Sequence, residues 1–451
     1  MGWRYSLGEL AALIGAEPPR NERTFEAVST DTRTLSTGAV FFALSGETFD
    51  GNGFVPEAFA KGAAAAVTTR AHPDGPCLVV PDPLAALQRF AARHREEHHG
   101  PLLAITGSCG KTGTKEFVAA LLGSCYKVAK TEGNLNNEIG TPLSLLALDA
   151  ETEFGVFELG ANHRGEIARM CAWAKPTESA ITLIAPAHLE GFGGIEAVAA
   201  AKAEIMEGLP RDGTFYVNTD DPRCVAIGER HPGETIRFGR EGDVALEDCH
   251  FDGAGEMVLR VRPVGTLRLP LLCRAHAHNV LLAIAVGLRH GVTEFEAPLR
   301  EAARKTLRFK PVKIGPFELL DDTYNSNPAS AAAALQALAD RPGGGARIAV
   351  LGDMLELGAE AARLHRELGA QARACGVTHL FVRGDFAGDV VEGAASDGGL
   401  HAEIIQHHEA MADAIVRAAP EGGSILLKGS RGMCMEKVIE ALQSHFGHNE
   451  E

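Results

Sequence analysis

A lysine and a threonine follow two glycines in the stretch TGSCGKT, residues 106–112, a spacing that suits the binding of phosphate groups. Glycines let backbone N–H groups approach phosphate oxygens, and the N-terminus of a following helix adds partial positive charge. Lys111 can then reach the terminal phosphates, and the hydroxyl of Thr112 can ligate Mg²⁺. The usual first glycine is absent, because Ile105 stands in its place. The apolar run before the loop and the helix-like run after it nevertheless favour a nucleotide site over an ordinary turn with a surface lysine.

Three further side chains could ligate a metal ion. Glu158 and His188 each follow an apolar run, FGVF and ITLIAPA, where a strand would end. A carboxylate there suits Mg²⁺, although a loop cap and a half-buried histidine are the plain alternatives. Lys202 lies on an apolar stripe at helical spacing within residues 195–206. Its amine either reaches water or is held neutral by burial and converted to a carbamate, which would supply a negatively charged oxygen ligand.

Three α/β segments must position these residues. The first ends near residue 96, before Gly100 and Pro101 break the chain, and the second contains the glycine loop. The third alternates strands and helices from about residue 317, which predicts a parallel sheet with helices on both faces. Ligands of such sheets bind at the carboxyl ends of the strands, where the chain carries LLDDTYNSNP, VLGDMLELG and LLKGSRGM.

The composition narrows the class of protein. A chain of 451 residues is expected to form two to three domains, and 45% hydrophobic with 23% charged residues indicates a soluble globular protein. The net charge of −16 argues against a general binder of nucleic acid or anionic membranes. Nine cysteines without a CxxC pair suit reduced thiols in the cytoplasm. We find neither a signal peptide nor an apolar run of membrane-spanning length.

A second motif points to a different chemistry. HREEH, residues 94–98, fits the H-x-x-E-H pattern of one class of zinc peptidases. The alternative is the solvated end of an amphipathic helix at a domain boundary. The abrupt stop at Gly100, the dense local charge and the lack of an evident third ligand favour the helix end.

Several blocks together resemble the Mur ligase family, in family order over nearly the whole chain. They are TGSCGKTGTKE, GNLNNEIGTPLSLL, ELGANHRGEI, PAHLEGFGG, AKAEI, NTDDP, DDTYNSNP, LGDMLELG and KGSRGMCMEKVIEAL. The resemblance implies an α/β protein of three domains. These are an N-terminal UDP-substrate domain over residues 1–97, a central P-loop ATPase-type domain with a parallel sheet over 98–309, and a C-terminal Rossmann-like domain over 310–451.

The resemblance also implies roles for individual residues. ATP would contact the loop residues Thr106, Gly107, Ser108, Cys109, Gly110, Lys111, Thr112 and Gly113, together with Asn137, Asn279, Arg308 and Asp322. Two Mg²⁺ ions would be held by Thr112 with Glu158, and by Glu158 with His188 and the carbamate of Lys202. Lys111, Glu158, His188 and Lys202 would form the catalytic group. Substrate would contact Ser29, Asp31 and Arg33 at a uridine signature, and Asn136, Tyr324, Asn325 and Asn327 elsewhere.

The chain departs from the family pattern at three positions. Cys109 and Gly113 stand where asparagine and a hydroxyl residue are commoner, and both flank Lys111, so they would tune the loop without abolishing phosphate binding. The hydroxyl of Thr114 is expected nearby. Thr32 replaces serine in the uridine signature and keeps a hydroxyl.

Within the family, the blocks are most similar to the member that joins D-alanyl-D-alanine to UDP-N-acetylmuramoyl-tripeptide. The implied reaction transfers the γ-phosphoryl group of ATP to the peptide carboxylate, and the dipeptide amine then displaces phosphate. We expect a cytoplasmic monomer without nucleic-acid partners or membrane insertion. A sibling ligase, a nucleotide-binding relative without ligase activity and the zinc peptidase are the alternatives. The absence of a D-N-P-R string argues against the diaminopimelate-adding sibling.

Overall fold

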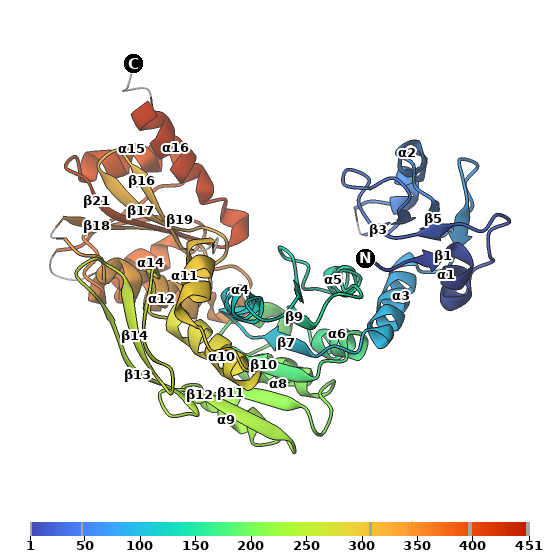
Figure 1. Cartoon of the computed structure of the whole chain (residues 1–451). Helices are drawn as coiled ribbons and strands as arrows, with labels where there is room; N and C mark the ends of the chain where they lie inside the picture. Colours follow the sequence, from blue (N-terminus) through green and yellow to red (C-terminus); the bar gives the residue numbers. More distant parts are fainter. Residues whose placement is uncertain (1, 47, 306–308, 344, 396–398, 448–451) are drawn as a thin grey trace.

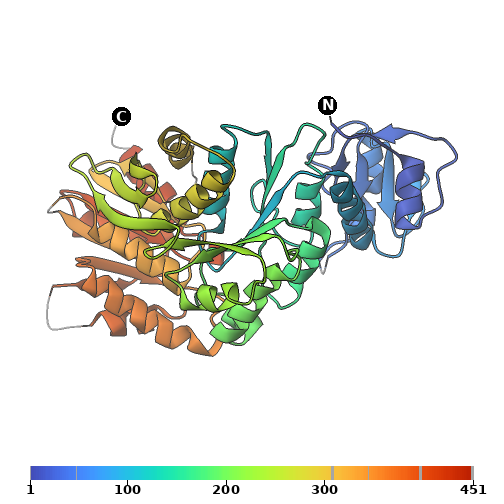
Figure 2. The same ribbon diagram turned by 60° about the horizontal axis from the view of Figure 1, so that its bottom comes forward.

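The computed structural model of the chain describes residues 2–46, 48–305, 309–343, 345–395 and 399–447. Figures 1 and 2 both show three units, with the central unit lying between a blue N-terminal unit at one end and a red C-terminal unit at the other. Among the described helices, none is long and apolar enough to cross a membrane.

The N-terminal unit is built on a parallel sheet of four short strands in the order β3-β4-β5-β6. Their bounds are Val28–Ser29, Val40–Phe42, Ala65–Thr68 and Cys77–Val79; β1 (Tyr5–Ser6) pairs antiparallel with β2 (Thr24–Phe25). The helices are α1 (Leu7–Ile14), α2 (Val55–Ala60) and α3 (Pro83–Glu97). The long helix α3 begins there because the Asp82 side chain accepts hydrogen bonds from the first free N–H groups and Pro83 needs no such partner.

The central unit contains a nine-stranded sheet in the order β15-β14-β13-β12-β11-β10-β7-β9-β8. The bounds are β7 (Leu102–Thr106), β8 (Val128–Lys130), β9 (Phe154–Glu158), β10 (Glu178–Ile181), β11 (Thr214–Asn218), β12 (Glu234–Gly239), β13 (Val244–Phe251), β14 (Met257–Arg262) and β15 (Gly265–Leu269). Strands β7 to β13 are parallel to their neighbours in the sheet, while β13, β14 and β15 form an antiparallel meander.

Helices cover both faces of this sheet, which explains why its central strands are apolar throughout. Leu103 and Ile105 of β7 pack with α4 (Lys111–Leu122) and α10 (His276–Arg289), whereas Leu102 and Ala104 belong to the core on the opposite face. The alternation along one strand therefore fills two cores. The remaining helices are α5 (Gly140–Leu145), α6 (Glu166–Ala174), α7 (Leu189–Phe192), α8 (Ile195–Ala203), α9 (Pro222–Gly228) and α11 (Glu296–Lys305).

The C-terminal unit has a six-stranded sheet in the order β16-β17-β21-β18-β19-β20. The strands are β16 (Lys310–Ile314), β17 (Phe317–Asp322), β18 (Ala346–Gly352), β19 (His379–Arg383), β20 (His401–Ile404) and β21 (Gly423–Lys428). All pair in parallel except β16, which runs antiparallel at the edge. The helices are α12 (Pro328–Ala339), α13 (Ala361–Ala374), α14 (Ala387–Ala394), α15 (His408–Ala418) and α16 (Glu436–Gly447). The predicted α/β class is confirmed; α14 and the antiparallel edge strand were not predicted.

Helix α3 fastens the N-terminal unit to the central unit. The ring of His94 contacts the Tyr5 hydroxyl at 3.0 Å through Nδ1 and the carbonyl oxygen of Leu148 at 2.7 Å through Nε2. The buried Arg95 donates from Nε to the carbonyl oxygen of Ala174 at 2.8 Å. The HREEH segment thus connects the two units. Both ring nitrogens of His94 already have partners, so His94 is not available as a zinc ligand, which argues against the zinc-peptidase alternative.

Candidate active site

The glycine loop connects the end of β7 to the start of α4, as the sequence predicts. Gly107 and Gly110 have φ angles of 146° and 82°, which side chains rarely allow. A Cβ at Gly107 would also lie 1.9 Å from Oγ1 of Thr182, which follows β10. The N–H of Ser108 donates to the carbonyl oxygen of Leu183 at 2.8 Å. The loop is therefore pressed against the end of the neighbouring strand, with its helix N-terminus facing the cavity.

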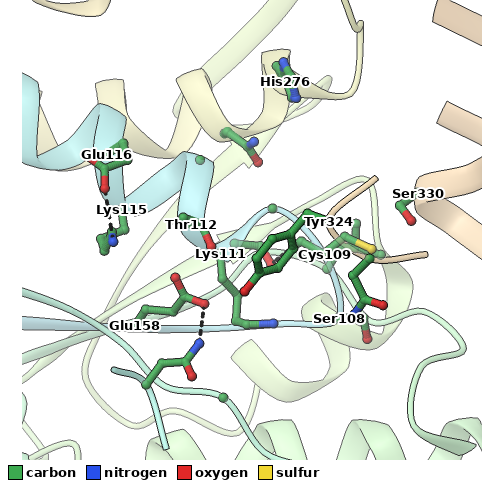
Figure 3. A pocket seen from close by; sticks show the side chains of 18 of the residues that line it. Ser108, Cys109, Lys111, Thr112, Lys115, Glu116, Glu158, His276, Tyr324 and Ser330 are labelled. Atoms are coloured by element: carbon green, nitrogen blue, oxygen red, sulfur yellow. Dashed lines mark hydrogen bonds and ion pairs between the residues drawn. The ribbon is translucent and has the colours of Figure 1, made fainter. Parts of the chain in front are cut away.

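The loop and the ends of both large sheets line one cavity of about 2640 Å³ between the central and C-terminal units. Ser108 to Gly113 line this cavity, and Figure 3 shows Lys111 and Thr112 beside Glu158. The ammonium group of Lys111 donates to the carbonyl oxygen of Gly107 at 2.8 Å. Thr106 lies outside the lining: it is fully buried and its hydroxyl donates to the carbonyl oxygen of Leu159 at 2.8 Å, so it joins β7 to β9.

Asn279, which the family resemblance assigns to ATP binding, lies on α10 against the glycine loop and lines the cavity. A Cβ at Gly110 would lie 2.6 Å from its Oδ1, and a Cβ at Gly113 would lie 2.8 Å from its Nδ2. The glycine at position 113 therefore leaves room for this amide. The hydroxyl of Thr114, expected near the loop, is fully buried and does not line the cavity.

Glu158 is the last residue of β9 and is only 3% exposed. Its Oε1 accepts a hydrogen bond from Nδ2 of Asn136 at 2.7 Å (Figure 3), whereas Oε2 is buried without a hydrogen-bond partner among the described residues. A buried carboxylate oxygen without a partner is costly. Because this one lines the cavity beside Thr112, the oxygen donors suit a hard cation such as Mg²⁺.

His188 lines the same cavity from the segment before α7. Its Nδ1 contacts a carboxylate oxygen of Glu356, which belongs to the C-terminal unit, and the N–H of Glu190 donates to the carbonyl oxygen of Glu356 at 3.0 Å. Burial lowers the pKa of the His188 imidazole, which favours the neutral form that ligates metals. The central and C-terminal units therefore meet at this histidine.

Lys202 on α8 is 2% exposed, so the alternative in which its amine reaches water is wrong. Its Nζ lies 5.7 Å from the centre of the Phe192 ring. Burial, with a further contribution from the nearby charge of Lys111, lowers the pKa of the Lys202 amine to about 7. A substantial fraction of the amine is thus neutral at physiological pH, as carbamate formation requires. Lys202 itself lies behind the cavity rather than in its lining.

Within the described residues, no group of three or more His, Cys, Asp and Glu side chains forms a ready-made metal site. The donors that the structure does bring to one cavity are Thr112, Glu158 and His188. Of these three, only Glu158 and His188 belong to the residue types His, Cys, Asp and Glu, so a second metal site would need a further oxygen ligand. The carbamate of Lys202 is the ligand that the sequence suggests.

The C-terminal unit supplies the other predicted residues of the cavity. Asp322 ends β17 and forms an ion pair with Lys428, whose Nζ also donates to the carbonyl oxygen of Asn325 at 2.9 Å. Tyr324 is exposed and lies beside Lys111 in Figure 3. Asn327 caps α12. Arg308 lies outside the described residues.

Asn136 and Asn137 precede α5 in the central unit and line the cavity. Asn136 orients Glu158, as described above. The side-chain oxygen of Asn137 accepts hydrogen bonds from the N–H groups of Ile139 at 3.1 Å and Gly140 at 2.9 Å. Asn137 therefore shapes the loop that carries Asn136.

The uridine signature forms one turn of the N-terminal unit. The Ser29 hydroxyl donates to the carbonyl oxygen of Asp31 at 2.8 Å, and Arg33 pairs with the Asp31 carboxylate at 2.6 Å. The Arg33 hydrogen bond holds the pKa of Asp31 at about 2. These residues are close to one another but lie apart from the lining of the large cavity.

Two residues of the site were not predicted. Thr182 fixes the glycine loop through contacts with the carbonyl oxygens of Thr106 and Cys109. Glu356 reaches His188 across 168 positions of sequence. Its only signal was its place in LGDMLELG, a block expected at the carboxyl end of a strand.

Comparisons with known proteins agree with this architecture. Three models of Mur ligase domains match the chain: the family's catalytic domain over residues 24–95, its middle domain over 105–287 and its glutamate ligase domain over 307–431. The chain belongs to the Mur ligase family.

Relatives of known name cover nearly the whole chain. The UDP-N-acetylmuramoyl-tripeptide–D-alanyl-D-alanine ligase of Escherichia coli K12 is 36% identical over 456 residues, covering 98% of each chain. A crystal structure of MurF from Acinetobacter baumannii superposes with a TM-score of 0.88 at 30% identity, covering 98% of this chain and 99% of the other. MurF from Thermotoga maritima in complex with ADP gives 0.84 at 27% identity, covering 94% and 98%.

Proposed function

We propose that the protein is an ATP-dependent amide ligase that joins D-alanyl-D-alanine to UDP-N-acetylmuramoyl-tripeptide in the synthesis of peptidoglycan precursors. The observation that carries the proposal is the single cavity in which the glycine loop, Lys111 and the buried carboxylate of Glu158 meet residues of the C-terminal unit. The names of full-length relatives supply the substrates, and the ADP complex of the Thermotoga maritima relative supports ATP as the phosphoryl donor.

The chemistry explains why such a cavity is needed. A carboxylate is a poor electrophile, because its charge repels an amine and because oxide is a poor leaving group. Transfer of the γ-phosphoryl group to the peptide carboxylate gives an acyl phosphate and ADP. The dipeptide amine, in its neutral form, then attacks the acyl carbon, a C–N bond forms, the nitrogen releases a proton, and phosphate leaves with the electron pair of the broken C–O bond. Two anions must approach each other in the first step, so the site must neutralise charge.

Residues of this chain can meet that requirement. The N–H groups at the start of α4 and the ammonium group of Lys111 face the phosphate position and would draw charge from the γ-phosphate. To do so, Lys111 exchanges its hydrogen bond with the carbonyl oxygen of Gly107 for one with phosphate. Positioning and electrostatics then account for the reaction without a protein nucleophile.

Mg²⁺ fits the donor set, since Oε2 of Glu158 is buried without a described hydrogen-bond partner. Thr112 and Glu158 would hold one ion, and Glu158, His188 and carbamylated Lys202 a second. Bound Mg²⁺ supplies positive charge that lowers the repulsion between nucleotide and carboxylate. In the carbamate, the neutral Lys202 nitrogen bonds to the carbon of CO₂ and loses one proton, so one negative charge replaces a potential positive one.

The family resemblance suggests the remaining roles. Asn137 and Asn279 would contact the nucleotide, as would Asp322 and Arg308 when the C-terminal unit closes over it, which would also keep water from the acyl phosphate. Tyr324, Asn325, Asn327 and Asn136 would contact the peptide end of the substrate. Ser29, Asp31 and Arg33 would hold the uridine end.

We also propose domain boundaries at residues 97/98 and 309/310. The sheets of four, nine and six strands fall on different sides of these boundaries, and the family models match three separate ranges that leave gaps near them. We place the enzyme in the cytoplasm, where ATP and UDP-linked precursors are made, as a monomer without nucleic-acid or membrane partners. The net charge of −16 supports the absence of nucleic-acid binding.

One assay tests the function. Phosphate release from ATP is measured with UDP-N-acetylmuramoyl-tripeptide and, in separate reactions, D-alanyl-D-alanine, free glutamate, free diaminopimelate or no acceptor. We expect sustained release and a new amide product with the dipeptide alone. Release with a free amino acid would identify a sibling ligase, and no release with any acceptor would contradict ligase activity.

A further inference from the structure

Glu356 is an acidic side chain of the cavity that the proposed mechanism leaves without a role. It lies in the segment between β18 and α13, lines the cavity, and its side chain remains 55% exposed although it touches His188. The other acid that the C-terminal unit brings to this cavity, Asp322, is already paired with the buried Lys428. Glu356 is therefore the carboxylate of this unit that is open to a ligand from the cavity.

The segment that carries Glu356 is held in a fixed shape. The N–H of Met354 donates to Nε2 of the buried His365 at 2.9 Å, and the N–H of Leu355 donates to the Ser430 hydroxyl at 2.8 Å. Glu356 itself has a φ of 64°, a left-handed conformation that costs a residue with a side chain about 1 kcal/mol or more. Such strain is kept where the surrounding contacts hold a side chain for a purpose.

A cation of the cavity lies on a segment tied directly to this one. Ser430, which bonds to the residue before Glu356, is followed in sequence by Arg431. The Arg431 side chain is 67% exposed, lines the cavity and lies 3.5 Å from Glu436. Lys428, by contrast, is 1% exposed and committed to Asp322 and Asn325. One rigid part of the C-terminal unit thus presents an accessible acid and an accessible guanidinium group to the same space.

A short peptide with both ends free is the ligand that matches this pair. Its ammonium group would bond to a carboxylate and its carboxylate to a guanidinium group, which forms strong charge-assisted hydrogen bonds with planar anions. We propose that Glu356 and Arg431 form the subsite for the zwitterionic dipeptide acceptor, with Glu356 binding the amine end and Arg431 the carboxylate end. This inference rests on the proposed function, whose mechanism needs an acceptor but does not say where it binds.

The position of Glu356 also suits the reaction. Its contact with His188 places it at the boundary with the central unit, where the glycine loop and Glu158 line the same cavity. An amine bound by Glu356 would therefore lie in the cavity that the glycine loop and Glu158 also line. Closure of the C-terminal unit would then bring the acceptor with it.

Steady-state kinetics of the full chain test the amine end. With ATP and UDP-N-acetylmuramoyl-tripeptide saturating, Glu356→Gln should raise the KM for D-alanyl-D-alanine about 10- to 100-fold, as expected for loss of a charge-assisted hydrogen bond. The KM values for ATP and for the tripeptide should change by less than about twofold. Glu360→Gln is the matched control, because Glu360 lies four positions away, pairs with Arg363 and does not line the cavity.

A substrate with one charge removed tests the carboxylate end. D-alanyl-D-alaninamide keeps the amine but lacks the anionic terminus, so wild-type protein should use it with a KM about tenfold or more above that of D-alanyl-D-alanine. Arg431→Gln should abolish this preference, while the surface variant Arg417→Gln should retain it. The wild-type comparison needs no substitution and is therefore independent of folding.

The outcomes separate the two proposals. No wild-type turnover with D-alanyl-D-alanine would overturn the proposed function and this subsite with it. Wild-type turnover combined with an unchanged KM for the dipeptide in Glu356→Gln would overturn the subsite alone. An equal rise in all three KM values would also overturn it, since it would show that Glu356 acts through His188 on the whole site. Equal use of amide and acid by wild-type protein would refute the role of Arg431.

Discussion

The thiol of Cys109 donates a 3.1 Å hydrogen bond to Oδ1 of Asn327, so the glycine loop and the first turn of α12 touch across the interface of the central and C-terminal units. The same oxygen accepts a hydrogen bond from the N–H of Ser330 at 2.9 Å, which caps α12. One side-chain oxygen of Asn327 therefore caps α12 and also contacts the glycine loop.

Because Asn327 has two roles and Cys109 only one, replacing Asn327 should destabilise the protein more than replacing Cys109. Asn327→Ala should lower the free energy of unfolding by about 1 kcal/mol, because it removes a helix cap. Cys109→Ala should cost about 0.5 kcal/mol or less, because a thiol is a weak donor and the cap remains. Urea denaturation of both single variants and of the double variant measures each loss in the free energy of unfolding and the interaction energy between the two residues. Equal losses would show that the capping role is minor.

Lys111 carries the charge closest to the predicted phosphate position. Lys111→Ala should reduce kcat by about 10²- to 10³-fold, the range seen when one group that stabilises developing charge is removed. Thermal unfolding should show an intact fold. Lys313→Ala, a lysine of the edge strand β16, removes the same charge far from the cavity and should retain full activity. A fully active Lys111→Ala variant would exclude the loop as the phosphate site.

Glu158 is expected to make the protein depend on a divalent cation. Glu158→Gln keeps the shape and the hydrogen bond from Asn136 to Oε1 but removes the negative charge. Activity should fall about 100-fold or more at a fixed Mg²⁺ concentration. Activity measured against Mg²⁺ concentration should show weaker half-saturation than wild type, and the exposed control Glu229→Gln should match wild type. Identical Mg²⁺ curves for Glu158→Gln and wild type would disprove the ligand role.

Lys202 tests the carbamate directly. Lys202→Ala should lose most activity, by about 100-fold, because a ligand oxygen disappears. Added formate or acetate should restore part of that activity by placing a carboxylate in the space left by the side chain. Wild-type protein, which already holds the group, should gain nothing from the same salts. Full activity of the variant without added acid would rule out metal ligation by this residue.

The buried amine also predicts a pH-dependent stability. Because the pKa of Lys202 in the folded protein is depressed to about 7 from its ordinary value of 10.5, the unfolded chain binds more protons between these values, and stability should rise with pH in that window. In CO₂-free buffer, wild type should gain about 2 kcal/mol relative to Lys202→Met between pH 7 and pH 9. Denaturant unfolding at both pH values measures this difference. Parallel pH profiles would contradict a depressed pKa.

Nearby residues in the sequence were sufficient to predict those parts of the candidate site that are formed by a single continuous segment of the chain. The glycine loop and Glu158 at the end of β9 follow from apolar runs and spacings within about 20 residues, whereas the apolar stripe around Lys202 left the burial of its amine open. Contacts between distant segments could not be predicted in this way. Glu356 meets His188 only because two sheets face each other, and Thr182 limits Gly107 only because β10 lies beside β7.

Strands β13 to β15 were not predicted from the sequence either, for a similar reason. Strands β13 to β15 alternate buried and exposed residues over short runs, with several charged residues on the solvent side. This alternation is typical of a strand with one exposed face. The charged residues interrupt the apolar runs from which strands were predicted, so these strands were not recognised.

The joint made by α3 has a consequence for which substrates fit. Because His94 and Arg95 bond to carbonyl oxygens of the central unit, we expect this contact to set the span from the Ser29–Arg33 turn to the glycine loop. We expect this span to select substrates by length. A nucleotide sugar bound at the Ser29–Arg33 turn would bring its peptide carboxylate to the glycine loop only when the peptide has the right number of residues.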